Sequence, residues 1–150
     1  MDLQTSSKTR SDKLLAATAI AFELYRKAHV YHFNVKGTTF AQDHEFLLDT
    51  YEELNGQFDD LGELCRQNGF LVPLEIESYS TLPQTNASEA GPTVMYDDLI
   101  KQFEVYKFAL ADVQGEWSSP VDSGTRASVE NIMSALSKRT WMLRAMYGIS

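Results

Sequence analysis

Apolar side chains recur at intervals of three and four residues along four long stretches of this chain. This spacing matches the turn of an α-helix, whereas the strict alternation typical of a strand is absent. The pattern therefore predicts four amphipathic helices, bounded by residues that commonly start or stop helices. They run from Ser11 to about Val35, from Thr38 or Thr39 to Asn68 or Gly69, from Thr93 as a cap to Pro120, and from the region of Asp122 to Thr125 onward.

Each predicted helix contributes one apolar stripe to a shared core. The stripes are Leu14, Ala17, Ala21, Tyr25, Ala28 and His32; Leu47, Tyr51, Leu54, Phe58, Leu61 and Cys65; Leu99, Phe103, Tyr106, Leu110, Val113 and Trp117; and Val129, Ile132, Leu136, Leu143 and Tyr147. Trp141 is also assigned to packing. Residues 70–92 carry three prolines and form a long connection, with a possible short helix at Leu74–Ser78. The chain thus fits an all-α, ferritin-like four-helix bundle with a crossover between the second and third helices.

The 150 residues, 43% of them hydrophobic, are enough for one self-supporting domain. We expect that domain over residues 11–150, after a flexible tail over residues 1–10. No stretch reaches the roughly 20 apolar residues of a membrane-spanning helix, and no basic-then-apolar leader opens the chain. The lone Cys65, read as a core residue, fits a reducing compartment. These observations predict a cytoplasmic protein without membrane contact.

A net charge of −8 argues against a body that wraps anionic polymers, because such proteins need a basic face to displace counterions from phosphate. The basic residues Lys8, Arg10 and Lys13 form the main cationic cluster, which we interpret as a solubilising tail. DNA binding is therefore expected to be weak or absent. An acidic surface suits metal cations better.

Two histidines and two carboxylates are the candidate metal ligands. Asp59 and Glu63 lie four residues apart on the second helix, so they project from one face about 6 Å apart. Such pairs are also common on solvated helix faces, and that interpretation stays open. His32 closes the first helix and His44 opens the second, so the turn at Gly37 can bring both imidazoles together; a capping or core role for His32 is the alternative. Imidazole and carboxylate groups suit iron and other divalent first-row metals.

One ion cannot bridge the histidines and the carboxylates of a single chain. Fifteen residues separate His44 from Asp59, which is about 22 Å along a helix. A two-fold dimer with antiparallel second helices would bring the histidines of one chain to the carboxylates of the other. An intrachain di-iron centre would need Glu-x-x-His pairs, and no histidine here has a Glu three residues before it. The sequence therefore predicts a site between subunits.

The run His32-Phe33-Asn34-Val35-Lys36-Gly37, followed by Phe40, His44, Asp59-x-x-x-Glu63 and Gly69, resembles the signature of the Dps mini-ferritins. Thr140-Trp141-Met142-Leu143-Arg144-Ala145 is similar to the end of their fourth helix, and the resemblance covers roughly residues 12–147. It implies a dodecameric ferroxidase shell that oxidises Fe²⁺, commonly with hydrogen peroxide and otherwise with O₂, and stores ferric mineral. It also implies that His32, Asp59 and Glu63 ligate iron and that His44 helps a second, looser iron position.

Two departures from the Dps pattern affect this expectation. Leu48 stands where the family usually has an acidic residue near the second iron, and the neighbouring Asp49 is turned by about 100° around the helix. Phe33 replaces the tryptophan that usually follows the first histidine. These changes keep open an alternative, a shell or DNA-associated protein of the same fold with a vestigial site. His29 shares a helix face with His32 and is interpreted as a structural histidine or an outer partner of the site.

Overall fold

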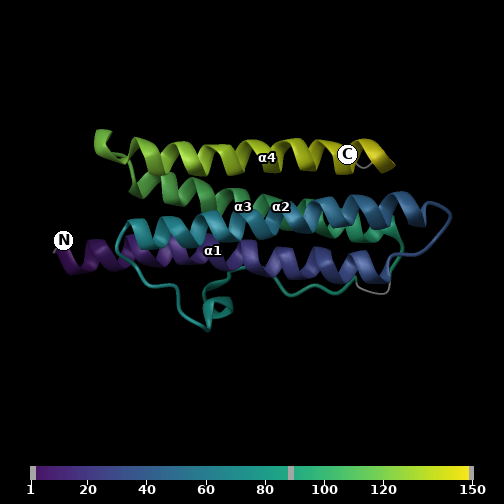
Figure 1. Ribbon diagram of the computed structural model, residues 1–150, viewed down its shortest axis with the longest axis horizontal. Helices are drawn as coiled ribbons and strands as arrows, with labels where there is room; N and C mark the ends of the chain where they lie inside the picture. The colour runs from purple at the N-terminus through teal and green to yellow at the C-terminus, as the bar shows by residue number, and fades with distance from the viewer. Residues whose placement is uncertain (1–2, 88–89, 149–150) are drawn as a thin grey trace.

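The computed structural model describes residues 3–87 and 90–148, with side chains described from Lys8 onward. Four long helices lie side by side (Figure 1): α1 (Leu3–Asn34), α2 (Phe40–Gln67), α3 (Pro92–Glu116) and α4 (Ser123–Tyr147). Two short 3-10 helices, η1 (Ile76–Tyr79) and η2 (Pro120–Asp122), lie in the connections. Within the described residues there is no strand. The predicted all-α four-helix bundle is therefore confirmed, including a short helix in the second connection.

The connections fix how the helices are ordered. Short links make α1 antiparallel to α2, and α3 antiparallel to α4 (Figure 1). The segment between α2 and α3 travels back along the bundle, so α2 and α3 run in the same direction (Figure 1). It is held to α1 by an ion pair between Arg26 and Glu77 at 3.1 Å and by a hydrogen bond from Ser80 to Glu23 at 2.8 Å. This is the one-crossover topology of ferritin-like bundles.

The predicted apolar stripes form the core, whereas Trp141, which was also assigned to packing, does not join it. Leu24, Leu54, Phe103 and Leu136, one from each helix, are all at most 1% exposed. α1 packs most extensively against α2, and α4 mainly against α3. The prediction for Trp141 is wrong, because its side chain is 64% exposed. It precedes the buried Leu143 by two residues, which turns it by about 200° to the outer side of α4.

Most helix ends match the sequence prediction, and two do not. Thr39 and Asn68 occupy the cap positions of α2, as expected. The third helix starts with Pro92 at its first position and Gly91 as its cap, so Thr93 is already inside the helix. Proline fits there because the first-turn N–H groups of a helix have no intrahelical partner.

The first helix begins at Leu3 rather than at Ser11, so residues 3–10 are helical instead of forming the expected tail. Residues 1–2 of that tail lie outside the described residues. Two of the three basic residues assigned to a solubilising role are instead engaged with the end of α3 and with η2. The Arg10 guanidinium lies 4.4 Å from the centroid of the Trp117 ring and 3.8 Å from the Asp122 carboxylate, and Lys13 pairs with Glu116 at 2.8 Å.

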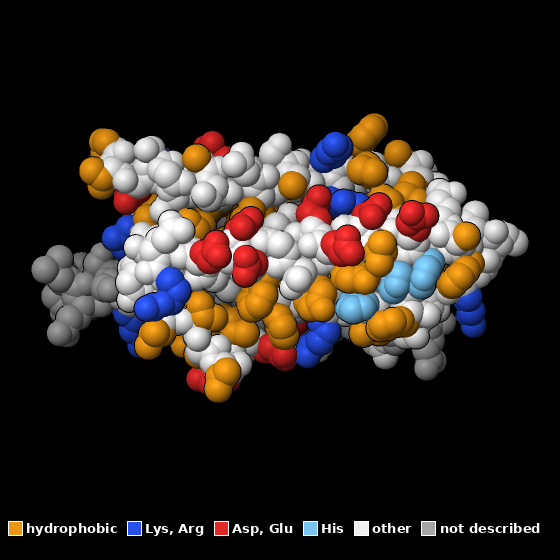
Figure 2. Space-filling model, in the orientation of Figure 1, with side chains coloured by type: hydrophobic (Ala, Val, Ile, Leu, Met, Phe, Trp, Pro, Cys, Tyr) orange, Lys and Arg blue, Asp and Glu red, His pale blue; other side chains and the backbone are white. Residues whose placement is uncertain are grey.

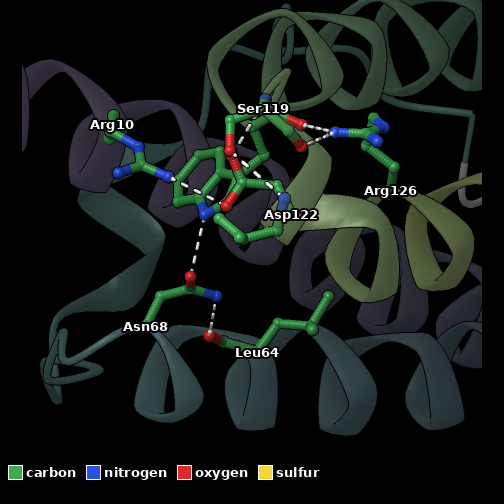
Figure 3. Close-up of polar contacts among 8 residues, drawn as sticks. Arg10, Leu64, Asn68, Ser119, Asp122 and Arg126 are labelled. Atoms are coloured by element: carbon green, nitrogen blue, oxygen red, sulfur yellow. Dashed lines mark hydrogen bonds and ion pairs between the residues drawn. The ribbon is translucent and has the colours of Figure 1, made fainter.

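Figure 3 shows how these contacts join several segments at one end of the bundle. The fully buried Trp117 donates its indole N–H to the Asn68 side chain at the end of α2, at 2.8 Å. Asp122 accepts a hydrogen bond from the Ser119 backbone, while Arg126 of α4 donates to the Trp117 and Ser119 carbonyls at 2.6 and 2.7 Å. The start of α1, the ends of α2 and α3, and the start of α4 are thereby fixed relative to one another.

A buried carboxylate holds the opposite end of α2. Asp43, in the first turn of α2, is fully buried and accepts hydrogen bonds from Thr39 at 2.6 Å, Tyr96 at 3.0 Å and Tyr147 at 2.6 Å. Burial, then the charge of Asp43 and the hydrogen bond to it, raises the pKa of Tyr96, so this phenol remains a donor. The carboxylate therefore ties the start of α2 to α3 and α4.

In the part of the chain that the structure describes, no helix has the length and apolar character to cross a membrane.

Replacing Asp43 by Ala should lower the free energy of unfolding by about 3 kcal/mol, because buried hydroxyl donors would lose their acceptor. Urea unfolding followed by circular dichroism, at equal protein concentration, measures the difference. Asp49→Ala removes an exposed carboxylate from the same helix and serves as the control. Equal unfolding midpoints for the two variants would contradict the assigned role of Asp43.

Candidate metal centre

The two predicted histidine ligands come together where α1 ends and α2 begins. His32 lies in the last turn of α1 and His44 in the second turn of α2, and the short connection between the helices lets their side chains meet. Their rings stack with centroids 3.7 Å apart and planes inclined by 15°. His32 is 8% exposed and His44 is half-buried. The expectation that these two side chains meet locally agrees with this geometry.

Reciprocal hydrogen bonds orient both imidazoles. The Nδ1 of His32 lies 2.6 Å from the His44 carbonyl oxygen, and the Nδ1 of His44 lies 2.7 Å from the His32 carbonyl oxygen. A carbonyl only accepts, so each Nδ1 must carry the hydrogen. In the neutral ring the Nε2 atom then keeps its lone pair and is free to bind a metal. The backbone therefore holds both rings in the form that a metal ligand requires.

Aromatic side chains surround the histidine pair. The ring of His29 stacks on Tyr51, with centroids 3.9 Å apart and planes inclined by 10°, and also on Phe33 at 4.8 Å. Tyr51 meets the His32 ring edge-on, at 5.3 Å between centroids. Phe40 stacks on His44 at 5.0 Å. His29 is thus a half-buried member of an aromatic cluster that adjoins the histidine pair.

The two predicted carboxylate ligands form a second group farther along α2. Asp59 and Glu63, joined by Asp60, each offer one oxygen atom such that the three atoms lie within 4.8 Å of one another, and all three residues are exposed. Three carboxylates so close together attract a cation to this position. Asp60 was not among the ligands predicted from the sequence, although its position three residues before Glu63 places both side chains on neighbouring parts of the helix face.

The structure does not bring these two groups together within one chain. Fifteen residues of continuous helix separate His44 from Asp59, which is about 22 Å. Figure 2 shows the imidazoles and the acidic side chains on the same face of the molecule, with the imidazoles nearer one end and several acidic side chains farther toward the other. Among the described residues, the Asp59 group is the only set of three or more His, Cys, Asp or Glu side chains that could hold a metal ion. The histidines and the carboxylates of one chain therefore cannot bind the same ion.

The positions on α2 close after His44 add no carboxylate to the histidine pair. Leu48 is half-buried one turn after His44 and offers no ligand atom. Asp49 is exposed and does not join the histidine pair in a set of three ligands within the described residues. The histidine group therefore lacks a carboxylate of its own.

Comparisons with known proteins agree with this fold. Residues 11–148 match the model of the ferritin-like domain. The chain is 31% identical over 140 residues to a DNA protection during starvation protein of Helicobacter pylori, covering 89% of this chain and 93% of that protein. It is also 32% identical over 133 residues to general stress protein 20U of Bacillus subtilis, covering 83% of this chain and 88% of the relative.

Solved structures give the same picture. Antigen TpF1 from Treponema pallidum superposes with a TM-score of 0.87 at 25% identity, covering 97% of this chain and 94% of that chain. A Dps protein from Bacillus brevis also reaches 0.87, at 22% identity, with 97% and 99% covered. The four helices, the single crossover and the family match define a ferritin-like protein. The chain belongs to the Dps family of mini-ferritins.

The hydrogen bonds of the two histidines predict one tautomer for both. Solid-state NMR of protein labelled with ¹⁵N-histidine should report a protonated Nδ1 and an unprotonated Nε2 for His32 and His44. Variants that lack one histidine assign the signals. Protonation at Nε2 of either ring would contradict the geometry and would leave that ring without a ready lone pair for a metal.

Proposed function

We propose that this protein is a ferroxidase and iron store: Fe²⁺ is oxidised by hydrogen peroxide or O₂ at sites shared between two subunits, and the ferric product collects as mineral in a dodecameric shell. The observation that carries the proposal is the division of the candidate ligands into an imidazole group and a separate carboxylate group. His32 and His44 lie at one end of α2, and Asp59 and Glu63 lie about 22 Å away on the same helix. Neither group alone combines imidazole and carboxylate ligands.

A two-fold axis between two subunits would bring the histidines of one chain to the carboxylates of the other. When two copies of α2 pack antiparallel, the histidine end of each helix faces the carboxylate part of its mate, and two identical sites form. The surface beside the histidines supports such a contact. Phe33 and Phe40 are 65% and 44% exposed, and their rings adjoin those of His32 and His44. Exposed apolar side chains grouped around polar ligands are typical of an interface.

The ligand chemistry fits iron as the substrate. Imidazole nitrogen and carboxylate oxygen bind Fe²⁺, and oxygen-rich coordination stabilises Fe³⁺ relative to Fe²⁺. His32, Asp59 and Glu63 would hold the first iron, and His44 would help to hold a second. Two Fe²⁺ ions supply both electrons that convert one peroxide molecule, with two protons, into two waters. A paired step of this kind releases no hydroxyl radical.

DNA binding is proposed to be weak or absent. The net charge is −8, and two of the basic residues near the N-terminus are engaged within the subunit, Arg10 with Asp122 and Trp117 and Lys13 with Glu116. Few cations therefore remain there to displace counterions from phosphate. We place the protein in the cytoplasm, where its buried single thiol, Cys65, needs no partner.

The competing function is a shell or DNA-associated protein whose metal site no longer turns over. Leu48 favours it, because the histidine group gains no carboxylate from the next turn of α2. The two functions predict different effects of removing the acidic ligands.

Anaerobic loading with Fe²⁺ followed by a peroxide pulse should give fast oxidation in the wild type, read as the rise in ferric absorbance. Asp59→Ala/Glu63→Ala should abolish the fast phase because the carboxylate half of every site is lost. Glu75→Ala/Asp112→Ala removes two exposed carboxylates elsewhere and should keep it. Light scattering checks that each variant still forms a shell. Equal slow rates in the wild type and the ligand variant would identify the site as vestigial.

Mixed shells test whether the site is shared. A His32→Ala/His44→Ala chain and an Asp59→Ala/Glu63→Ala chain should each be inactive alone. When the two chains are coexpressed and assemble at random, half of the dimers contain one copy of each chain. Each mixed dimer has one intact site out of two, so about a quarter of wild-type activity should return. Ligands confined to one chain would give no recovery, and that result would exclude the two-fold site.

A further inference from the structure

If the proposed ferroxidase function is correct, the incomplete second iron position leaves the site one electron short of what the reduction of peroxide requires. Reducing peroxide to water takes two electrons, and one bound Fe²⁺ supplies one. Leu48 offers no ligand and His44 is the only predicted ligand for the second iron, so single occupancy is expected at low iron. Without a second donor, one Fe²⁺ would split peroxide into hydroxide and a hydroxyl radical. An oxidisable side chain close to the histidines would prevent this.

Tyr51 is the side chain in that position. It lies on α2, two turns after His44, and its ring meets the His32 ring edge-on with centroids 5.3 Å apart. The Tyr51 ring also stacks on the His29 ring, with centroids 3.9 Å apart and planes inclined by 10°. The ring is therefore in direct contact with the predicted iron ligand His32. Among the described residues no hydrogen bond to its hydroxyl group is found, and the residue is half-buried.

The other aromatic groups around the histidines are less suited to give an electron. Phe33 and Phe40 touch His32 and His44 but carry phenyl rings, which are much harder to oxidise than a phenol. Tyr25 is a phenol, yet it contacts His29 at 5.7 Å and Tyr51 at 6.1 Å rather than His32. Tyr25 could reduce an oxidised Tyr51, but it is one side-chain contact farther from the predicted iron ligand His32. Trp117 is buried at the other end of the bundle, where it contacts Arg10 and Asn68.

We propose that Tyr51 is the one-electron donor of this site, oxidised when a single Fe²⁺ meets hydrogen peroxide. Iron gives one electron and becomes Fe³⁺, and the phenol gives the second electron and its proton and becomes a neutral tyrosyl radical. The peroxide O–O bond breaks, and its two oxygens take both electrons, the phenolic proton and one proton from solvent to leave as two waters. Atoms and charge balance, and no hydroxyl radical is formed.

The test uses the assembled wild-type protein loaded anaerobically with fewer Fe²⁺ ions than sites, then mixed with one peroxide per iron and frozen. Electron paramagnetic resonance should detect a tyrosyl radical, and its signal should narrow when the tyrosine rings are deuterated. Tyr51→Phe keeps the stacked ring and removes only the oxidisable hydroxyl. Tyr79→Phe, on η1 away from the histidine cluster, is the matched control. A spin trap measures hydroxyl radical in parallel, and light scattering checks the shell.

The proposal expects the radical in the wild type and in Tyr79→Phe, its loss in Tyr51→Phe, and more trapped hydroxyl radical in Tyr51→Phe. A radical that persists in Tyr51→Phe, or wild-type iron oxidation without any radical, would overturn the role of Tyr51 and leave the ferroxidase function standing. A wild type that does not oxidise iron at all in the optical measurement would overturn the ferroxidase function and this role with it.

Discussion

The packing of α1 against α2 governs the candidate site, because both histidines depend on it. His32 and His44 belong to different helices, and each ring is oriented by the backbone carbonyl of the other. These two hydrogen bonds exist only while the end of α1 and the start of α2 stay in register. Any shift along the helix pair would free both rings and lose the tautomer that leaves Nε2 available. The geometry of the candidate ligands is thus a product of helix packing rather than of a dedicated metal loop.

The same dependence explains why both ends of α2 are fixed by polar contacts within a mainly apolar bundle. Apolar stripes resist separation but only weakly oppose sliding, since one methyl group replaces another with little loss. Hydrogen bonds are directional, and a buried group that loses its partner is costly. Asp43 fixes the start of α2 to α3 and α4, and Asn68 fixes its end to Trp117. The helix that carries His44 and Asp59 is therefore held at both ends.

The fold was largely predictable, and the exceptions have physical reasons. The start of α2, the crossover and the buried stripes followed from periodicity and from helix-stopping residues. The start of α1 did not, because Arg10 and Lys13 look solvated in sequence and find Trp117, Asp122 and Glu116 only after α3 and α4 are packed. Trp141 was assigned to packing as a core-type position, but it lies two residues before the buried Leu143 and is turned to the outer side of α4.

For the candidate site, the sequence by itself determined which groups could bind iron and that one chain could not join them, because the rise of an α-helix sets the distance between His44 and Asp59. Only the tertiary structure decided the stacking of His32 on His44, their reciprocal backbone hydrogen bonds and the contact of Tyr51 with His32. Spacing along a helix is a local property that every residue pair inherits from backbone geometry. Contacts between helices depend on the side chains that fill the space between them, and no local pattern encodes that packing.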